Sequence, residues 1–344
     1  MLVTENLVSG ILLVLAAGFF QGTFILPMKY TRGWSWENTW LGFSVTAYLV
    51  CPWLVALLTV PHLGQVLSHT STATEVRTLL WGIAWGIGAV TFGLGVDYLG
   101  MALGFAIIIG LAAAIGTLVP FLVLSHVNPA SAQGIIILAG TGLVLVGVSV
   151  CSWAGKLREN ASPKDPGTSD PSPKKSYVLG VLICVLSGVL SCCGNLAFAF
   201  GSEMSTVAIK FGTDPQYASN PLWALLTFPL LICNTVFCAY LFVRERSLPK
   251  FLLPGTGRNY LLSISMGAMW LAGFLLYGMA AARLGKMGSS VGWALIMSSM
   301  VVVANLWGIL TGEWRSAGRK PFQTMIIGLI TLIGAMFLVG SGLK

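Results

Sequence analysis

Long apolar stretches, separated by short polar breaks, occupy almost the whole chain. A hydrocarbon core about 30 Å thick is crossed by about 20 helical residues, and a helix satisfies its own backbone hydrogen bonds in lipid. Ten stretches are long enough, and they lie near residues 7–28, 38–60, 77–97, 101–124, 133–153, 177–200, 219–243, 259–281, 288–311 and 321–341. The pattern therefore predicts an all-α membrane protein with ten transmembrane helices.

The last five stretches repeat sequence features of the first five. At one constant offset of 185 residues, Gly82, Trp85, Gly88, Gly93, Leu99 and Gly100 correspond to Gly267, Trp270, Gly273, Gly278, Leu284 and Gly285. An offset of 170 relates Gly10 and Gly18 to Gly180 and Gly188. Because each set holds an odd number of spans, the second copy crosses the membrane upside down. Two such inverted five-helix repeats are typical of secondary transporters, whose substrate binds near the midplane between the halves.

A polar segment separates the two sets. Residues 156–176 contain four prolines and mixed charge, which predicts a flexible cytoplasmic linker between a first repeat, 1–155, and a second repeat, 177–344. With ten spans, both termini lie on the side opposite to the linker. Loops on the linker side carry 14 of the 19 Lys and Arg residues, and cytoplasmic loops collect positive charge. We therefore expect both termini outside.

Composition narrows the classes of function. Only 9% of the residues are charged and 56% are hydrophobic, so most of the folded surface meets lipid. The net charge of +8 comes from the loops, and we expect no nucleic-acid partner. His62, His69 and His126 are scattered, and the seven cysteines show no metal-ligand spacing. The sequence has no Ser/His/Asp set, paired carboxylates or nucleotide-binding loop, so we expect neither an enzyme nor a bound cofactor or metal.

Several polar and tryptophan positions resemble those of a known family. They are Trp34-Ser35-Trp36-Glu37 with Trp40, Pro52-Trp53, Trp85-Gly86-Ile87-Gly88, Tyr98-Leu99-Gly100-Met101, Asp214-Pro215 with Tyr217, and Glu313-Trp314 with Ala317-Gly318-Arg319. In this order, over nearly the whole chain, they resemble the L-rhamnose/proton symporter family of the drug/metabolite transporter superfamily. The resemblance implies spans 3, 4, 8 and 9 around a central cavity, and inward movement of a deoxyhexose with the proton as coupling ion. The chain departs from the family pattern at Gly288-Ser289-Ser290, where the family leads us to expect larger aromatic and acidic residues.

A neutral sugar is held by stacking of its C–H face on aromatic rings and by hydrogen bonds to its hydroxyls. Trp85 and Trp270 occupy equivalent mid-span positions, away from the interfacial belt where tryptophan is common, and Tyr277 shares a helical face with Trp270. The polar candidates for substrate binding are Gln21, Asn195, Asn234, Asn305 and Ser289. For every candidate the alternative is helix packing or helix tying, and Ser289 with Ser290 also fits a helix N-cap.

Proton coupling requires a titratable group that both sides of the membrane can reach, but no acidic residue lies at mid-span. Three alternatives follow: an acid near a span end is drawn into the cavity by a broken helix, coupling uses another route, or the protein is a uniporter or an exchanger. Among the acids near span ends, Glu37 ranks first and Glu203 second. Glu37 and Glu313 have Arg32, Arg315 and Arg319 nearby in sequence, so ion pairs among these residues are candidates for closing the cytoplasmic mouth. Lys210 and Asp214, in the predicted outer loop after the sixth span, are a weaker candidate pair for the external mouth. For all of these charged residues the alternative is that they lie in ordinary solvated loops.

Together these observations favour a secondary active transporter of the bacterial cytoplasmic (inner) membrane. It would import a neutral sugar, with L-rhamnose as first choice, by proton symport and alternating access. The alternative on the same fold is an exporter or exchanger of another small metabolite, such as an amino acid or a nucleotide sugar. A membrane enzyme or a channel has no motif in its favour. We expect the sugar and the lipid bilayer as partners, and a monomer or weak dimer.

Overall fold

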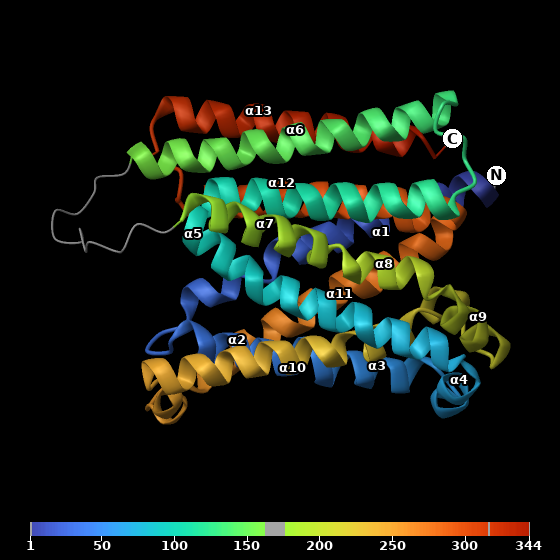
Figure 1. Ribbon diagram of the computed structural model, residues 1–344, viewed down its shortest axis with the longest axis horizontal. Coiled ribbons are helices and arrows are strands. Elements are labelled where there is room, and N and C mark those ends of the chain that lie inside the picture. The colour runs from blue at the N-terminus through green and yellow to red at the C-terminus, as the bar shows by residue number, and fades with distance from the viewer. Residues whose placement is uncertain (1, 162–175, 316, 344) are drawn as a thin grey trace.

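The structure is a computed structural model that describes residues 2–161, 176–315 and 317–343. Within these residues every regular element is a helix (Figure 1). The α-helices are α1 (Leu2–Thr23), α2 (Trp36–Val45), α3 (Cys51–Thr59), α4 (Leu63–His69), α5 (Thr72–Leu124), α6 (Ala132–Ala161), α7 (Tyr177–Ser191), α8 (Cys193–Phe200), α9 (Ser202–Lys210), α10 (Asn220–Glu245), α11 (Gly257–Leu284), α12 (Gly288–Leu310) and α13 (Arg319–Ser341). Short 3-10 or π segments are η1 (Leu26–Tyr30), η2 (Thr46–Val50), η3 (Pro215–Tyr217), η4 (Leu248–Leu252) and η5 (Gly285–Met287).

The number of long apolar helices agrees with a polytopic membrane protein. In the described part of the chain, nine helical stretches are long and apolar enough to cross a bilayer. The longest, 257–310, has 54 residues and contains two helices, α11 and α12, with η5 between them. Each of the ten predicted spans therefore falls on helix, and the all-helical membrane class predicted from the apolar pattern is confirmed.

Two glycines reverse the chain without a loop. Within α5 the backbone at Gly100 has φ 79° and ψ 163°, and between α11 and α12 Gly285 has φ 64° and ψ −139°. Residues with a Cβ atom rarely adopt this region of backbone space and are strained there, so glycine is favoured at both positions. At Gly100 α5 turns back along the molecule (Figure 1). Two membrane-crossing segments thus follow each other directly at each of these positions.

Two other predicted spans are interrupted more gently. The span predicted at 38–60 consists of α2, the π segment η2 and α3, and Pro52 lies in the first turn of α3. The span predicted at 177–200 consists of α7 and α8, with a turn at Cys192 between them. Hydrophobicity is uniform through both regions, so it does not reveal these interruptions. Both are close to the central residues described below.

The helices run mostly lengthwise, and both termini lie at one end of the molecule (Figure 1). We call this the terminal end, and we call the opposite end, where α6 finishes and α7 begins, the linker end. α6 extends to Ala161, so helix continues beyond 155, the predicted end of the first repeat. The rest of the predicted linker, 162–175, lies outside the described residues.

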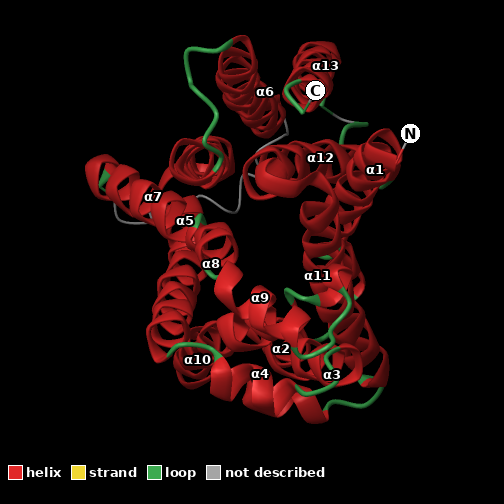
Figure 2. Cartoon of the chain, turned by 90° about the vertical axis from the view of Figure 1, so that its right-hand side faces the viewer, coloured by secondary structure: helices red, strands yellow, loops and turns green. Residues whose placement is uncertain are grey.

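Pairs of helices from distant parts of the sequence pack side by side. α5 packs on α7, α6 on α13, and α1 on both α11 and α12 (Figures 1 and 2). Many large apolar side chains point outward instead, among them Leu58, Val243 and Phe337, which are 75%, 81% and 77% exposed. Such a surface is unfavourable in water and suits a lipid environment.

Candidate functional site

Two tryptophans from distant helices meet in the core. Trp85 of α5 and Trp270 of α11 have ring centroids 5.7 Å apart, and their planes are inclined by 33°. They are only 9% and 6% exposed. Phe274 contacts both rings, at 5.4 Å from Trp85 and 4.5 Å from Trp270, and Tyr48 of η2 lies 4.9 Å from Trp270. The two tryptophans that occupy equivalent positions in the sequence therefore form one aromatic cluster.

The aromatic cluster continues toward α12. Trp223 of α10 lies 5.0 Å from Phe274, and Phe198 of α8 lies 5.3 Å from Trp223 and 5.0 Å from Tyr277. Tyr277 is in turn 5.8 Å from Trp293 of α12. The sequence analysis did not single out Phe198, Phe274, Trp223 or Trp293. The only signal for Phe274 and Trp293 was helical spacing from a chosen residue, because the other contacts depend on how the helices cross.

A buried polar network adjoins the aromatic cluster and centres on Asn195. The Asn195 Nδ2 donates to the carbonyl oxygens of Gly116, at 2.7 Å, and Ser289, at 2.9 Å. The Tyr277 hydroxyl lies 2.5 Å from Asn195 Oδ1 and 3.1 Å from the Ser289 carbonyl. α5, α8, α11 and α12 thus meet at one amide. Asn195, Tyr277 and Ser289, which were predicted separately, come together here, and Ser289 contributes its backbone oxygen.

Small residues at the start of α12 permit the close packing of α12 against α11. A Cβ at Gly288 would stand 2.3 Å from the Ala281 carbonyl oxygen. A larger side chain at position 288 would therefore not fit against α11 in this arrangement. The departure from the family pattern therefore has a local packing reason at Gly288.

Gln21 connects α1 to the tryptophan pair. Its Nε2 donates to the carbonyl oxygen of Trp270 at 2.7 Å, and the side chain is buried. Its amide also packs against Gly273, where a Cβ would stand 2.6 Å from Gln21 Nε2. Gln21 therefore borders the aromatic cluster and holds the backbone of the helix that carries Trp270.

The other two predicted amides lie apart from this network. Asn234 accepts a hydrogen bond from Trp40 Nε1 at 2.9 Å and donates to the Leu230 carbonyl at 2.8 Å. Asn305 donates to the Val301 carbonyl of its own helix at 2.9 Å. The contacts of Asn234 tie α10 to α2, and those of Asn305 are local, which fits the helix-tying alternative.

Glu37 is a buried carboxyl group at the start of α2, only 4% exposed. It accepts a hydrogen bond from the Ser247 hydroxyl. Among the described residues no Lys, Arg or His nitrogen lies within 4 Å of it. The neighbouring Asn38 donates to the Ser247 carbonyl at 3.2 Å, so α2 is bound to the loop before η4. A buried carboxyl without a cation is uncommon, because an isolated charge is costly to bury.

Glu313 forms ion pairs, although with other partners than the sequence suggested. It contacts Lys29 of η1, and its Oε2 accepts from Arg158 of α6 at 2.9 Å. Arg32 uses its backbone to bind Asn259. No ion pair within 4 Å joins Glu37 or Glu313 to Arg32, Arg315 or Arg319 in the described residues. Lys29 and Arg158 are far from Glu313 in sequence, so proximity along the chain could not identify them.

Glu203 lies at the terminal end, at the start of α9. Its carboxylate accepts from the Ser71 backbone N–H at 2.9 Å, from the Ser71 hydroxyl at 2.7 Å, and from the Thr74 hydroxyl. These donors belong to the first turn of α5, so Glu203 binds that helix start to α9. The predicted pair of Lys210 and Asp214 is not formed within the described residues, where Asp214 caps η3 through the Gln216 N–H at 3.0 Å.

Comparison with known proteins places the whole chain in one family. The sequence profile of the L-rhamnose-proton symport protein family (RhaT) matches residues 3–344. An L-rhamnose-proton symporter of Cronobacter sakazakii is 31% identical over 341 residues, which cover 97% of each chain. One of Escherichia coli is 28% identical over 330 residues, which cover 93% of each chain.

These relatives are named as symporters, which are transporters and not enzymes. The apolar helices, the ten predicted spans and the match over the full length agree with one another. On this evidence, the chain belongs to the L-rhamnose-proton symport protein family, a family of multi-pass membrane transporters.

Proposed function

We propose that this protein imports L-rhamnose together with a proton by alternating access across the bacterial cytoplasmic membrane. The observation that carries the proposal is the family match over residues 3–344. The buried cluster of aromatic rings and amides at the meeting point of α5, α8, α11 and α12 supports it physically, because it offers both kinds of contact that a sugar needs.

We further propose that residues 1–155 and 177–344 are inverted copies of one five-helix unit, as in the drug/metabolite transporter superfamily. Reciprocal glycine contacts support this. A Cβ at Gly10 would stand 2.8 Å from the Leu284 side chain, and one at Gly180 would stand 2.7 Å from Leu99. Gly10 corresponds to Gly180, and Leu99 corresponds to Leu284, at the offsets found in the sequence. Gly100 and Gly285, which reverse the chain, follow these leucines.

The proposed sugar site is the space that opens between Trp85 and Trp270. In this conformation the two rings pack against each other and are nearly covered, so no sugar reaches their faces. Trp85 belongs to the first half and Trp270 to the second. A relative movement of the halves would part the rings and let the C–H face of the sugar replace ring-to-ring contact. Gln21, Asn195 and Tyr277 would then supply hydrogen bonds to the hydroxyls.

Glu37 is the proposed proton carrier. Its burial, its single hydroxyl donor and the lack of a cation within 4 Å in the described residues support this role. Neutralisation by a proton removes the cost of burying a charge. Loading of the proton would therefore favour the arrangement in which α2 packs on the loop that carries Ser247. Release would follow when this contact opens to water.

The excess of Lys and Arg at the linker end supports a cytoplasmic position for that end, with both termini outside. The ion pairs of Glu313 with Lys29 and Arg158 lie at this end and join η1 to the loop before α13. Such contacts between the halves would have to break when the mouth opens inward. A monomer or weak dimer remains the expected assembly.

Uptake by purified protein in proteoliposomes tests the function. Labelled L-rhamnose should accumulate inside when the outside is more acidic, and a protonophore should abolish the accumulation. A pH-sensitive dye trapped inside should report proton entry that depends on added rhamnose. Unlabelled amino acids and nucleotide sugars serve as competitors. Accumulation that survives the protonophore, or competition by an amino acid but not by rhamnose, would overturn the proposal.

A further inference from the structure

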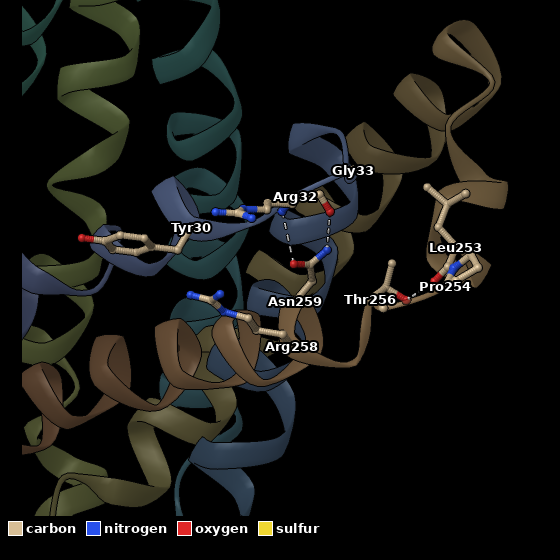
Figure 3. Close-up of a pocket in the computed structure, with 9 residues that line it drawn as sticks. Tyr30, Arg32, Gly33, Leu253, Pro254, Thr256, Arg258 and Asn259 are labelled. Atoms are coloured by element: carbon tan, nitrogen blue, oxygen red, sulfur yellow. Dashed lines mark hydrogen bonds between the residues drawn. The ribbon is translucent and has the colours of Figure 1, made fainter.

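A pocket of about 380 Å³ lies at the linker end, outside the proposed sugar site. It forms where residues 30–33, which follow α1, meet residues 253–259, which lead into α11 (Figure 3). Tyr30 and Arg32 line it from the first half, and Thr256, Arg258 and Asn259 line it from the second. No acidic side chain is among the residues that line it.

Asn259 fixes the two segments to each other. The Arg32 backbone N–H donates to Asn259 Oδ1 at 3.3 Å, and Asn259 Nδ2 donates to the Arg32 carbonyl at 2.8 Å. Asn259 is only 3% exposed. Thr256 holds the approaching loop through a 2.8 Å bond from its hydroxyl to the Leu253 carbonyl. The Asn259 side chain thus pairs with both the N–H and the carbonyl of Arg32. This pairing holds Arg32 next to Arg258, the residue that precedes Asn259.

The two arginine side chains extend to the same side of this connection. Their guanidinium groups both reach toward the region of Tyr30 (Figure 3), and both side chains are exposed. Among the residues that the structure describes, no carboxylate lies within 4 Å of either guanidinium. Two acids of this end have other cationic partners, since Glu313 contacts Lys29 and Glu245 contacts Arg244. Two neighbouring cations therefore share a pocket without a counter-ion.

We propose that this pocket binds a phosphate group between Arg32 and Arg258. A guanidinium presents a planar fork of donors that matches phosphate oxygens in pairs, and two forks can hold one phosphate from two sides. The first turn of α11 lines the same pocket and adds a favourable dipole. The phosphate comes either from a soluble phosphate ester or from the headgroup of an anionic phospholipid. Either one would join the two halves at this mouth.

Thermal unfolding of the purified full chain in a neutral detergent tests the site independently of transport. Inorganic phosphate, compared with sodium chloride at equal ionic strength, should raise the melting temperature of the wild type. Arg32→Gln and Arg258→Gln should each require about tenfold more phosphate for the same rise, because each loses a charge-assisted contact. Both side chains are exposed, so both variants should fold.

Arg283→Gln is the matched control. Arg283 lies at the other end of α11 and is exposed, so this variant loses the same charge away from the pocket. It should respond to phosphate like the wild type. Equal responses of Arg258→Gln and Arg283→Gln would show that phosphate acts elsewhere.

Reconstitution distinguishes the two sources of phosphate. The proteins are compared in vesicles of phosphatidylcholine alone and in vesicles that contain phosphatidylglycerol. Stabilisation by phosphatidylglycerol that both Arg→Gln variants lose indicates a lipid headgroup. Stabilisation by added phosphate in phosphatidylcholine vesicles, again lost in both variants, indicates a soluble ester. If neither phosphate nor phosphatidylglycerol stabilises the wild type, the site does not exist as proposed.

Discussion

Trp85 and Trp270 occupy corresponding positions but have different surroundings. Trp270 packs against Phe43, Tyr48, Phe274 and Trp85, whereas among aromatic rings Trp85 contacts Trp270 and Phe274 in the described residues. The ring of Trp270 is therefore held on more sides. A sugar that enters between the two rings would find one fixed face and one that can adjust.

Replacing Trp85 tests stacking directly. Trp85→Leu keeps an apolar side chain but removes the aromatic face, and we expect the half-saturation concentration for rhamnose uptake to rise about tenfold, since such a contact contributes up to about 1.5 kcal/mol. Trp85→Phe should raise it much less. Trp153→Leu is the control, because Trp153 is 54% exposed on the outer surface of α6. An equal change in all three variants would remove Trp85 from the site.

Glu37→Gln tests the proposed proton carrier. A glutamine imitates the protonated carboxyl permanently, so the variant should exchange labelled for unlabelled rhamnose across the membrane but lose accumulation driven by a proton gradient. Its exchange rate should also be independent of pH. Glu245→Gln is the control, since Glu245 is an exposed acid at the same end. Gradient-driven accumulation by Glu37→Gln at the wild-type level would assign coupling to another group.

At the scale of elements, the direct reversals at Gly100 and Gly285 determine how the central helices are paired. In each case a helix that lines the core is followed at once by its neighbour, with no loop to absorb movement. The close pairs would therefore be expected to move as units, whereas the connections around η1 and η4 contain more irregular backbone.

The backbone at these glycines predicts a clear stability difference. A Cβ at Gly100 or Gly285 meets nothing within 4 Å, so strain from positive φ alone should act. We expect Gly100→Ala and Gly285→Ala each to lower the free energy of unfolding by about 1–3 kcal/mol. Gly142→Ala in α6 also enters open space but has ordinary helical φ, and it should be neutral or stabilising. Thermal melts in detergent measure all three, and equal melting temperatures would contradict the role given to φ.

The positions of the helices were largely predictable from the sequence, because apolar length and polar breaks are local signals. The interruptions at η2 and at Cys192 were not, since a π turn or a break between two helices changes hydrogen bonding without changing hydrophobicity. The same limit applies to the end of α6, where polar residues continue the helix to Ala161.

The central residues were partly predictable. The constant offset singled out Trp85 and Trp270, and the cost of burying an amide singled out Asn195 and Gln21. The partners were not predictable, because backbone carbonyls such as that of Gly116 carry no sequence signal. Likewise Glu313 and Lys29 are 284 residues apart, so their contact depends on the packing of whole helices.

At the scale of the whole molecule, alternating access requires the linker end to open. Cysteines introduced at Lys29 and Glu313 and joined by a short bifunctional methanethiosulfonate should block rhamnose uptake, and a reducing agent should restore it. The seven native cysteines are free and buried or half-buried. Each single-cysteine variant treated in the same way is the control and should retain uptake. Full uptake by the cross-linked double variant would mean that these segments need not separate.

The shared end of α1 and α13 has a practical consequence for reporters (Figure 1). Complementary fragments of a split fluorescent protein, fused one to each terminus, would emerge into the same compartment and could assemble on a single molecule. Fragments placed instead at one terminus and within the segment between α6 and α7 would be kept apart by the bilayer. The presence or absence of fluorescence would then reveal which of these positions share a compartment in living cells.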